Sequence, residues 1–147
     1  MGLLSARIET SIDIAAPPAT VWRLLTNFPR MGDWNPFITA IEGRQAVGER
    51  LLVRTSLGPG EAFEFRPILL RIEPERELRW RGQLPVPGLF SGEHYFLLSP
   101  LGTGARLDHG ENFEGLLVLL MPGLLRKTER SFEAMNAALK RVAEADG

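Results

Sequence analysis

The stretch that decides the fold is "ARLDHGENFEGLLVLLMPGLLRKTERSFEAMNAALKRV" (105–142), in which the spacing of the apolar residues changes midway. Over residues 105–114, a set of core-type positions alternates with polar neighbours, which is typical of a β-strand with one buried face. This set is Leu107, His109, Glu111 and Phe113. The core-facing side of the predicted strand therefore carries a histidine and a carboxylate, although a polar group buried without a partner costs a few kcal/mol.

The later residues of the stretch have the period of a helix. Their apolar face recurs every three or four residues and consists of Leu125, Thr128, Phe132, Met135, Leu139 and Val142. Pro122 stands near the expected start, where a proline fits the first turn. The pattern predicts a long C-terminal helix directly after the last strand.

The chain upstream predicts one strand and two short helices. Residues 8–14 alternate apolar and polar side chains, as a strand does. "APPATVWRLLTNF" (16–28) begins with prolines suited to a first helical turn and continues with apolar residues at helical spacing. "PRMGDW" (29–34) predicts a second short helix, and "NPFITAIEG" (35–43) returns to extended chain after its proline.

The middle of the chain predicts consecutive antiparallel strands. Within "EAFEFRPILLRIEP" (61–74), Phe63 and Phe65 hold odd positions, whereas the next apolar residues hold even ones. Such a slip around Arg66 and Pro67 predicts a β-bulge with both phenylalanines facing inward. Three more strands follow, in "ELRWRG" (77–82), "LFSGEHYFLLS" (89–99) and "GARLDHGENFEGLL" (104–117).

Segregated strands and helices indicate an α+β fold in one domain that covers residues 1–147. We expect a curved antiparallel sheet of about seven strands, with two short helices after the first strand. The long C-terminal helix must cover the apolar face of this sheet, because that face cannot stay in water.

The composition excludes several classes of protein. A formal net charge of -1 with scattered basic residues gives no reason to expect a nucleic-acid partner. The absence of cysteine excludes disulfides and thiol chemistry. The N-terminus does not have the pattern of a secretory signal, and the longest apolar run, "GLLVLLMPGLL" (115–125), is too short to span a bilayer. We therefore expect a cytoplasmic protein without stable membrane insertion, as a monomer or homodimer.

Several segments of the sequence, together with the order of the predicted elements, resemble the START-like (SRPBCC) superfamily with its helix-grip fold, most of all the bacterial polyketide cyclase/dehydrase-like branch. They are "IDIAAPPATVWRLLTNFPRMGDWNPF" (12–37), "ELRWRG" (77–82), "SGEHYF" (91–96), "HGENFEGLL" (109–117) and "FEAMNAALK" (132–140). The resemblance covers essentially the whole chain. It implies an apolar internal cavity between the sheet and the C-terminal helix, but no particular function, because one scaffold hosts many functions.

The candidate site follows from the last hairpin. If Ser99 to Gly104 form its loop, Phe96 faces Leu107 and His94 faces His109, and the inner face also carries Glu111. Apolar side chains from neighbouring strands and from the helix would enclose this cluster. The candidate ligand-binding residues are Trp34, Trp80, Phe90, His94, Phe96, Leu107, His109, Glu111, Phe113, Phe132, Met135 and Asn136.

The cluster of His94, His109 and Glu111 has several interpretations. The three side chains can satisfy one another as a structural polar patch. They can orient one end of a small molecule in an apolar pocket. As catalytic candidates, a histidine and the glutamate can form a general base and its orienting partner, as an aromatising cyclase needs. Two histidines and a carboxylate can also ligate a divalent metal, although we expect neither metal nor cofactor here.

Other features also keep two interpretations. Trp34 in "GDWNPF" is either a structural anchor or a residue of the cavity rim, and Trp22 is either core or ligand contact. Asn35 is expected to fix a turn through its side chain. The run 115–125 is plain core, a lid, a dimer contact or a surface that touches membrane.

The preferred function is binding or carriage of a small apolar or amphipathic ligand, lipid-like or polyketide-like. It is favoured because no nucleophile elbow, phosphate loop or dinucleotide fingerprint occurs in the sequence. One alternative is a cyclase or dehydratase that uses the histidine and glutamate. Another is a protein-interaction module, such as one that stimulates a chaperone.

Overall fold

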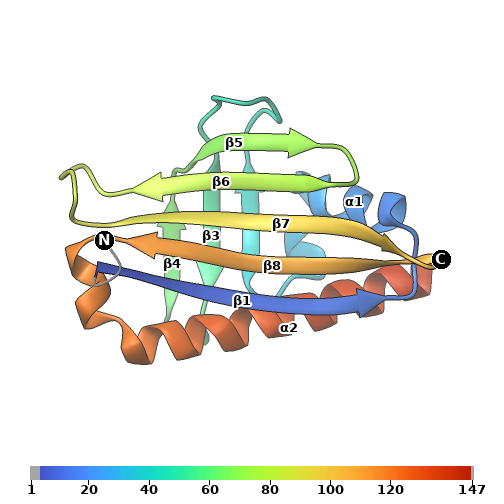
Figure 1. The fold of residues 1–147 in the computed structure, drawn as a ribbon. Helices are drawn as coiled ribbons and strands as arrows, with labels where there is room; N and C mark the ends of the chain where they lie inside the picture. The colour runs from blue at the N-terminus through green and yellow to red at the C-terminus, as the bar shows by residue number, and fades with distance from the viewer. Residues whose placement is uncertain (1–3, 147) are drawn as a thin grey trace.

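The computed structural model describes residues 4–146. These residues form eight strands, two α-helices and two short 3₁₀ helices (Figure 1). In chain order they are β1 (Ser5–Ile14), α1 (Pro18–Thr26), η2 (Phe28–Asp33), β2 (Ile38–Glu42), β3 (Leu52–Ser56), β4 (Ala62–Phe65), β5 (Ile68–Glu73), β6 (Glu77–Gln83), β7 (Ser91–Leu101), β8 (Gly104–Glu114), η3 (Leu116–Leu120) and α2 (Pro122–Asp146). The predicted α+β class, the two short helices after the first strand and the long C-terminal helix are confirmed.

The strands form two antiparallel sheets that meet at one place. The larger sheet has the order β1-β8-β7-β6-β5 and the smaller one has the order β2-β3-β4. A bridge between Arg50 and Ile68 joins them, and the Leu51 amide donates a hydrogen bond to the Pro67 carbonyl at 2.8 Å. These contacts pair backbone groups of the two sheets with each other at the point where the chain passes from one sheet into the other.

The prediction for residues 61–74 was wrong. Instead of one bulged strand, the segment forms β4 in the small sheet and β5 in the large one, and the chain changes sheet at Arg66 and Pro67. This division accounts for the eighth strand. Phe63 and Phe65 are 43% and 47% exposed rather than inward, because β4 is the edge of the small sheet. A register shift does occur nearby, but it lies between Leu69 and Arg71.

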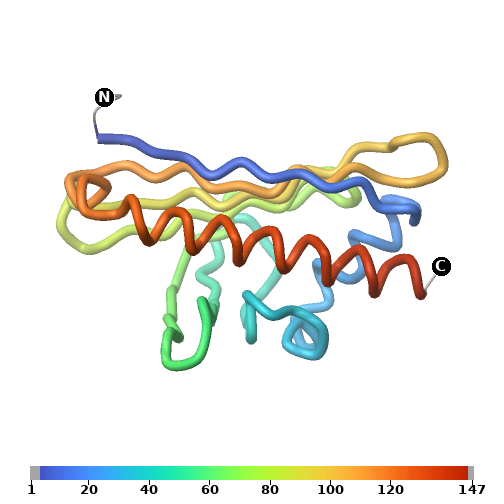
Figure 2. The backbone as a smooth tube through the Cα atoms, turned by 90° about the horizontal axis from the view of Figure 1, so that it is seen from below, coloured from blue at the N-terminus to red at the C-terminus, as the bar shows by residue number. Residues whose placement is uncertain are grey.

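The large sheet is covered on one face only. Figure 2 shows α2, α1 and the small sheet on the same side of it, and no other described element covers the opposite face. The predicted helix stripe faces the sheet, with Phe132, Met135 and Leu139 fully buried. Burying side chains of this size contributes roughly 1.5–3 kcal/mol each, so this contact holds the layers together.

The β7–β8 hairpin is tighter than expected. Leu101 pairs with Gly104, so only two residues make the turn, and Gly102 takes the positive φ of 62° that such a turn favours. The longer loop predicted from Ser99 to Gly104 was therefore wrong by two residues of register. His94 faces Glu111 rather than His109, and Phe96 faces His109 rather than Leu107. Because the slip is an even number, both histidines still point to the covered face.

Among the described residues, no helix combines the length and apolar character needed to cross a bilayer. The apolar run 115–125 forms η3 and the first turn of α2.

Candidate functional site

A continuous chain of polar side chains runs through the covered face of the large sheet. The His94 Nδ1 lies 3.2 Å from the Glu111 Oε1, and its Nε2 lies 2.8 Å from the His109 Nε2. The His109 Nδ1 lies 2.8 Å from the Asn136 Oδ1, on α2. The Asn136 Nδ2 donates to the Thr10 Oγ1 at 2.9 Å, and that hydroxyl donates to the His109 carbonyl at 2.6 Å. We call these five residues the polar chain.

Aromatic rings enclose the two histidines. Phe132 stacks on His109 with ring centroids 4.2 Å apart and planes within 6°. Trp80 stacks on His94 at 5.1 Å, and Phe96 stacks on His109 at 4.5 Å. The structure places these three predicted rings against the histidines, and it adds Phe37, which the sequence-based prediction missed and which lies 6.3 Å from His94 and 5.2 Å from Phe132.

These rings fill the interior around the histidines, so an internal cavity stays a prediction. Phe37 could have been suspected, since it is an apolar residue directly before a strand that must turn toward the core.

Burial sets the charge of the polar chain. It lowers the pKa of His94 to about 3 and raises the pKa of Glu111 to about 8. Burial, with the neighbouring His94, also holds the pKa of His109 well below its usual range. At neutral pH both imidazoles are therefore uncharged and Glu111 is mostly a neutral acid, which greatly reduces the cost of enclosing them.

Among the three ionisable members of the polar chain, Glu111 is the one that opens to solvent. Its side chain keeps 18% of its exposure, against 6% for His94. The carboxyl lies over Gly92, where a Cβ would collide with Oε2, and beside the Phe113 ring. Within the described residues Oε2 has no hydrogen-bond partner, and no buried side-chain oxygen is left unpaired, so Oε2 touches solvent.

Exposed apolar residues gather at the end of the molecule where β8 ends, near Glu111. The β6–β7 loop, η3 and the start of α2 come together there (Figure 1), joined by a hydrogen bond from the Leu116 amide to the Gly88 carbonyl. The exposed side chains are Leu84, Val86, Leu116, Leu119, Leu120 and Leu124, each 40–79% exposed. We call this group the leucine end. Glu111 lies near the end of β8 that leads into it.

The remaining predicted site residues lie around the polar chain in different ways. Phe90 stacks on Phe113 at 5.9 Å. Leu107 and Met135 are fully buried in the core. Trp34 ends η2, is partly buried and has no ring contact with the histidines among the described residues, so its role at a rim stays a prediction. Asn35 fixes the turn as expected, because its Oδ1 accepts the Phe37 and Ile38 amides.

The geometry does not fit a metal at the histidines. The two Nε2 atoms face each other at 2.8 Å, which leaves no room for an ion between them. Among residues 4–146, no group of three or more histidines and carboxylates is arranged to hold a metal ion.

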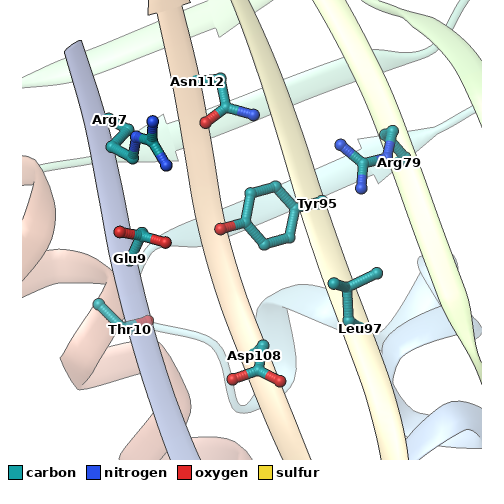
Figure 3. Close-up of a pocket in the computed structure, with 8 residues that line it drawn as sticks. All are labelled: Arg7, Glu9, Thr10, Arg79, Tyr95, Leu97, Asp108 and Asn112. Atoms are coloured by element: carbon teal, nitrogen blue, oxygen red, sulfur yellow. The ribbon is translucent and has the colours of Figure 1, made fainter.

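The open face of the large sheet carries a polar hollow of about 340 Å³ (Figure 3). It is lined by Arg7, Glu9, Thr10, Arg79, Tyr95, Leu97, Asp108 and Asn112. The Arg79 guanidinium stacks over the Tyr95 ring at 5.0 Å and pairs with Glu93 at 2.8 Å. Tyr95 also covers Gly110, where a side chain would collide with it. An aromatic ring laid over a strand glycine is a packing device, so we interpret this hollow as structural.

Solved structures share this fold. The chain superposes with a TM-score of 0.77 on the Zhui aromatase/cyclase from Streptomyces sp. R1128, at 17% identity over 95% of this chain and 94% of that one. It superposes with a TM-score of 0.76 on a START superfamily protein from Mycobacterium smegmatis, at 18% identity over 96% and 99% of the two chains. The superposition on TTHA0849 from Thermus thermophilus has a TM-score of 0.76, at 17% identity over 97% of this chain and 99% of that one. No curated protein sequence matches this chain significantly.

The family model for polyketide cyclase / dehydrase and lipid transport matches residues 5–144. This span includes every described strand and the histidine cluster. The sequence-based resemblance to the START-like superfamily is confirmed: the chain belongs to the polyketide cyclase / dehydrase and lipid transport family.

Proposed function

We propose that this protein binds a small apolar or amphipathic molecule between the large sheet and α2, with the polar end of the molecule at Glu111. The family description, which joins cyclases with lipid transport, supports a ligand of this class. The inner wall of aromatic and aliphatic side chains offers apolar contact, and the polar chain offers one fixed polar point. Such a combination is typical of small-molecule sites.

One observation carries the proposal: the polar chain reaches solvent at Glu111, whose carboxyl lies over Gly92 with the Phe113 ring, near the end of β8 that leads into the leucine end. A polar network that served packing alone would gain nothing from a free carboxyl oxygen at an apolar surface, because that oxygen weakens the apolar contact. A ligand with one polar group and an apolar body would match both surfaces at once.

The ligand enters, in this proposal, at the leucine end. The interior at the histidines is packed ring on ring, and dense packing resists insertion. At the leucine end the apolar side chains already lie in water, so displacing them costs little burial. The contacts that hold this end include the ion pair between Lys127 on α2 and Glu61 before β4.

Trp80 provides the test, because its ring stacks on His94. The chain has three tryptophans, so replacing Trp22 and Trp34 with phenylalanine leaves Trp80 as the sole reporter. We expect 1-decanol to change the Trp80 fluorescence saturably, with one molecule bound per chain. The matched control keeps Trp22 alone, on α1, and should respond little. No saturable change, or an equal change in both variants, would overturn the proposal.

Catalysis is the second candidate, and the contact between Glu111 and His94 favours it. One proton shared between a carboxyl and an imidazole can move as a ligand proton is taken up, which is what a general base for proton abstraction beside a carbonyl requires. The test is deuterium exchange at the carbons next to the carbonyl of 2-decanone. Catalysis predicts acceleration by the wild type that falls by at least about a hundredfold in Glu111→Gln. Equal exchange with and without the protein would exclude this activity on ketones.

A further inference from the structure

The hydrogen atoms of the polar chain can be placed from one end, because it ends on a backbone carbonyl. The Thr10 hydroxyl donates its single hydrogen to the His109 carbonyl, which can only accept. The Thr10 Oγ1 must therefore accept from Asn136, and this requires the amide nitrogen of Asn136 to face it. The oxygen of the same amide then faces the His109 Nδ1. These hydrogen bonds therefore determine which end of the Asn136 amide is the oxygen and which is the nitrogen.

The same logic continues through the two rings. Asn136 offers an acceptor, so the His109 Nδ1 carries the hydrogen and the His109 Nε2 of the neutral ring carries none. The contact between the two Nε2 atoms then needs its hydrogen on His94. Because burial keeps the His94 ring neutral, its Nδ1 then carries no hydrogen, and Glu111 supplies the hydrogen of the last contact from its Oε1. The buried location of all three groups agrees with this uncharged arrangement.

The free oxygen of Glu111 is then an acceptor. Its Oε1 carries the proton toward His94, and its Oε2 faces solvent over Gly92 with no hydrogen of its own. We propose that the ordered polar chain selects neutral ligands that end in a hydroxyl group, which donates to the Glu111 Oε2, and that Asn136 is the positioning residue that sets this preference. This inference rests on the proposed binding function and names the ligand class of that site.

The preference has a simple physical basis. A hydroxyl-ended ligand replaces the water on Oε2 with a hydrogen bond of its own. A methyl ether has no hydrogen to donate and leaves Oε2 unpaired on burial, and a carboxylate places a charged acceptor against another acceptor. We expect 1-decanol to bind at least about tenfold more tightly than decyl methyl ether and decanoate, a difference of about 1.4 kcal/mol.

Asn136→Leu should abolish the preference. Without an acceptor at its Nδ1, the His109 ring can carry its hydrogen on Nε2 and donate to His94, which then donates from Nδ1 to Glu111. The acid proton moves to the Glu111 Oε2, which can then donate to an ether oxygen, and the preference for the alcohol over the ether disappears. Thr10→Ser is the matched control, because it keeps the hydroxyl that orients Asn136 and should keep the preference.

The first readout is the tautomer of each ring, measured by ¹⁵N NMR of the unliganded protein. The chain has two histidines, so each resonance can be assigned with one variant. At neutral pH we expect His109 with its hydrogen on Nδ1 and His94 with its hydrogen on Nε2, and we expect both to switch in Asn136→Leu. Opposite tautomers in the wild type, or a protonated ring, would overturn the inference. If Asn136→Leu does not fold, the tautomers of the wild-type histidines still show the direction of the hydrogen bonds along the polar chain.

The second readout is the binding of the three decyl compounds, which separates this inference from the proposed function. If all three bind equally, the binding function stands and the hydroxyl preference is wrong. If none binds, the binding function fails and the ligand class falls with it. A preference for decanoate would contradict the neutral, accepting state of Glu111.

Discussion

At the scale of single residues, the polar chain consists of groups that burial keeps uncharged. Glu111 is protonated where glutamates in water are ionised, and His94 is neutral where histidines in water begin to charge. Each shift means that one protonation state costs stability in the folded protein. The stability of the protein should therefore depend on pH in a way that these residues determine.

The sign of each contribution follows from the direction of the shift. The raised pKa of Glu111 gives stability that is present below pH 4.5 and is lost as pH rises toward about 8. The lowered pKa of His94 gives stability that is present above pH 6.5 and is lost as pH falls toward about 3, and His109 acts in the same direction. Between pH 4.5 and 6.5 the two histidines outweigh the single glutamate. For these three groups the free energy of unfolding is therefore greatest near pH 6.5.

We predict that the free energy of unfolding falls by about 1 kcal/mol between pH 6.5 and pH 8, because the loss from Glu111 exceeds the gain from the two histidines, whose unfolded forms finish losing their protons there. Glu111→Gln should remove most of this slope, whereas Glu133→Gln, on the exposed side of α2, should keep it. Urea unfolding at several pH values measures both. A fall that persists in Glu111→Gln would show that another group causes it, and would contradict the raised pKa of Glu111.

The sequence predicted the facing of these residues but not their partners. Alternation alone placed His94, His109 and Glu111 on the covered face, because the facing of a strand residue depends only on odd or even position. Their pairing depends on the length of the turn, and a two-residue turn at Gly102 was not distinguishable from a longer loop in "SPLGTG". The contact between the two histidines arises from side chains that reach diagonally across the pair of strands.

At the scale of elements, the β6–β7 pair makes the space that Glu111 occupies. Gly82 and Gly92 lie opposite each other on these strands, but only Gly92 is beneath the Glu111 carboxyl. A methyl group at Gly82 would have its nearest neighbour at 3.9 Å, the Pro67 Cβ. Gly92 therefore leaves the space that the Glu111 carboxyl occupies, whereas a side chain at position 82 would meet no close neighbour.

Gly92→Ala should push the Glu111 carboxyl away from His94. It should destabilise the protein by about 1–3 kcal/mol, as expected for an overpacked interior. Gly82→Ala is the matched control and should change stability by no more than about 0.5 kcal/mol. Thermal unfolding of the two variants checks this. Equal stability would mean that Glu111 can leave its position without loss, and the polar chain would then not be fixed in the way we describe.

The sequence predicted most elements from their periods and failed where the chain changes sheet. The stripe of α2 is long and regular, so its burial followed directly. In residues 61–74, alternation was read as one strand with a bulge, although Pro67 marks the passage from β4 to β5. The alternation within a strand carries no information about which sheet the strand joins, because that depends on its pairing with another strand, β3 for β4 and β6 for β5.

At the scale of the whole molecule, the large sheet has one closed face with the polar chain and one open face with salt bridges. Figure 2 shows that α2 runs along the whole length of the closed face. The leucine end and the β7–β8 turn lie at opposite ends of the large sheet (Figure 1). An apolar ligand that reaches Glu111 has the shortest path from the leucine end.

We predict that Leu119→Asp combined with Leu120→Asp slows the association of 1-decanol at least about threefold while the melting temperature changes little, because both side chains are exposed. Leu101→Asp, an exposed leucine in the β7–β8 turn, is the control and should leave the rate unchanged. Stopped-flow fluorescence of Trp80 measures the rates. Equal slowing by both changes would place the entrance elsewhere.

The crystal structure of the complex with 1-decanol tests the central claim most directly. The account predicts density for the alkyl chain between β8 and α2, with the hydroxyl oxygen about 2.7 Å from the Glu111 Oε2. Density in the hollow over Tyr95 on the open face, or an interior unchanged at saturating 1-decanol, would contradict it.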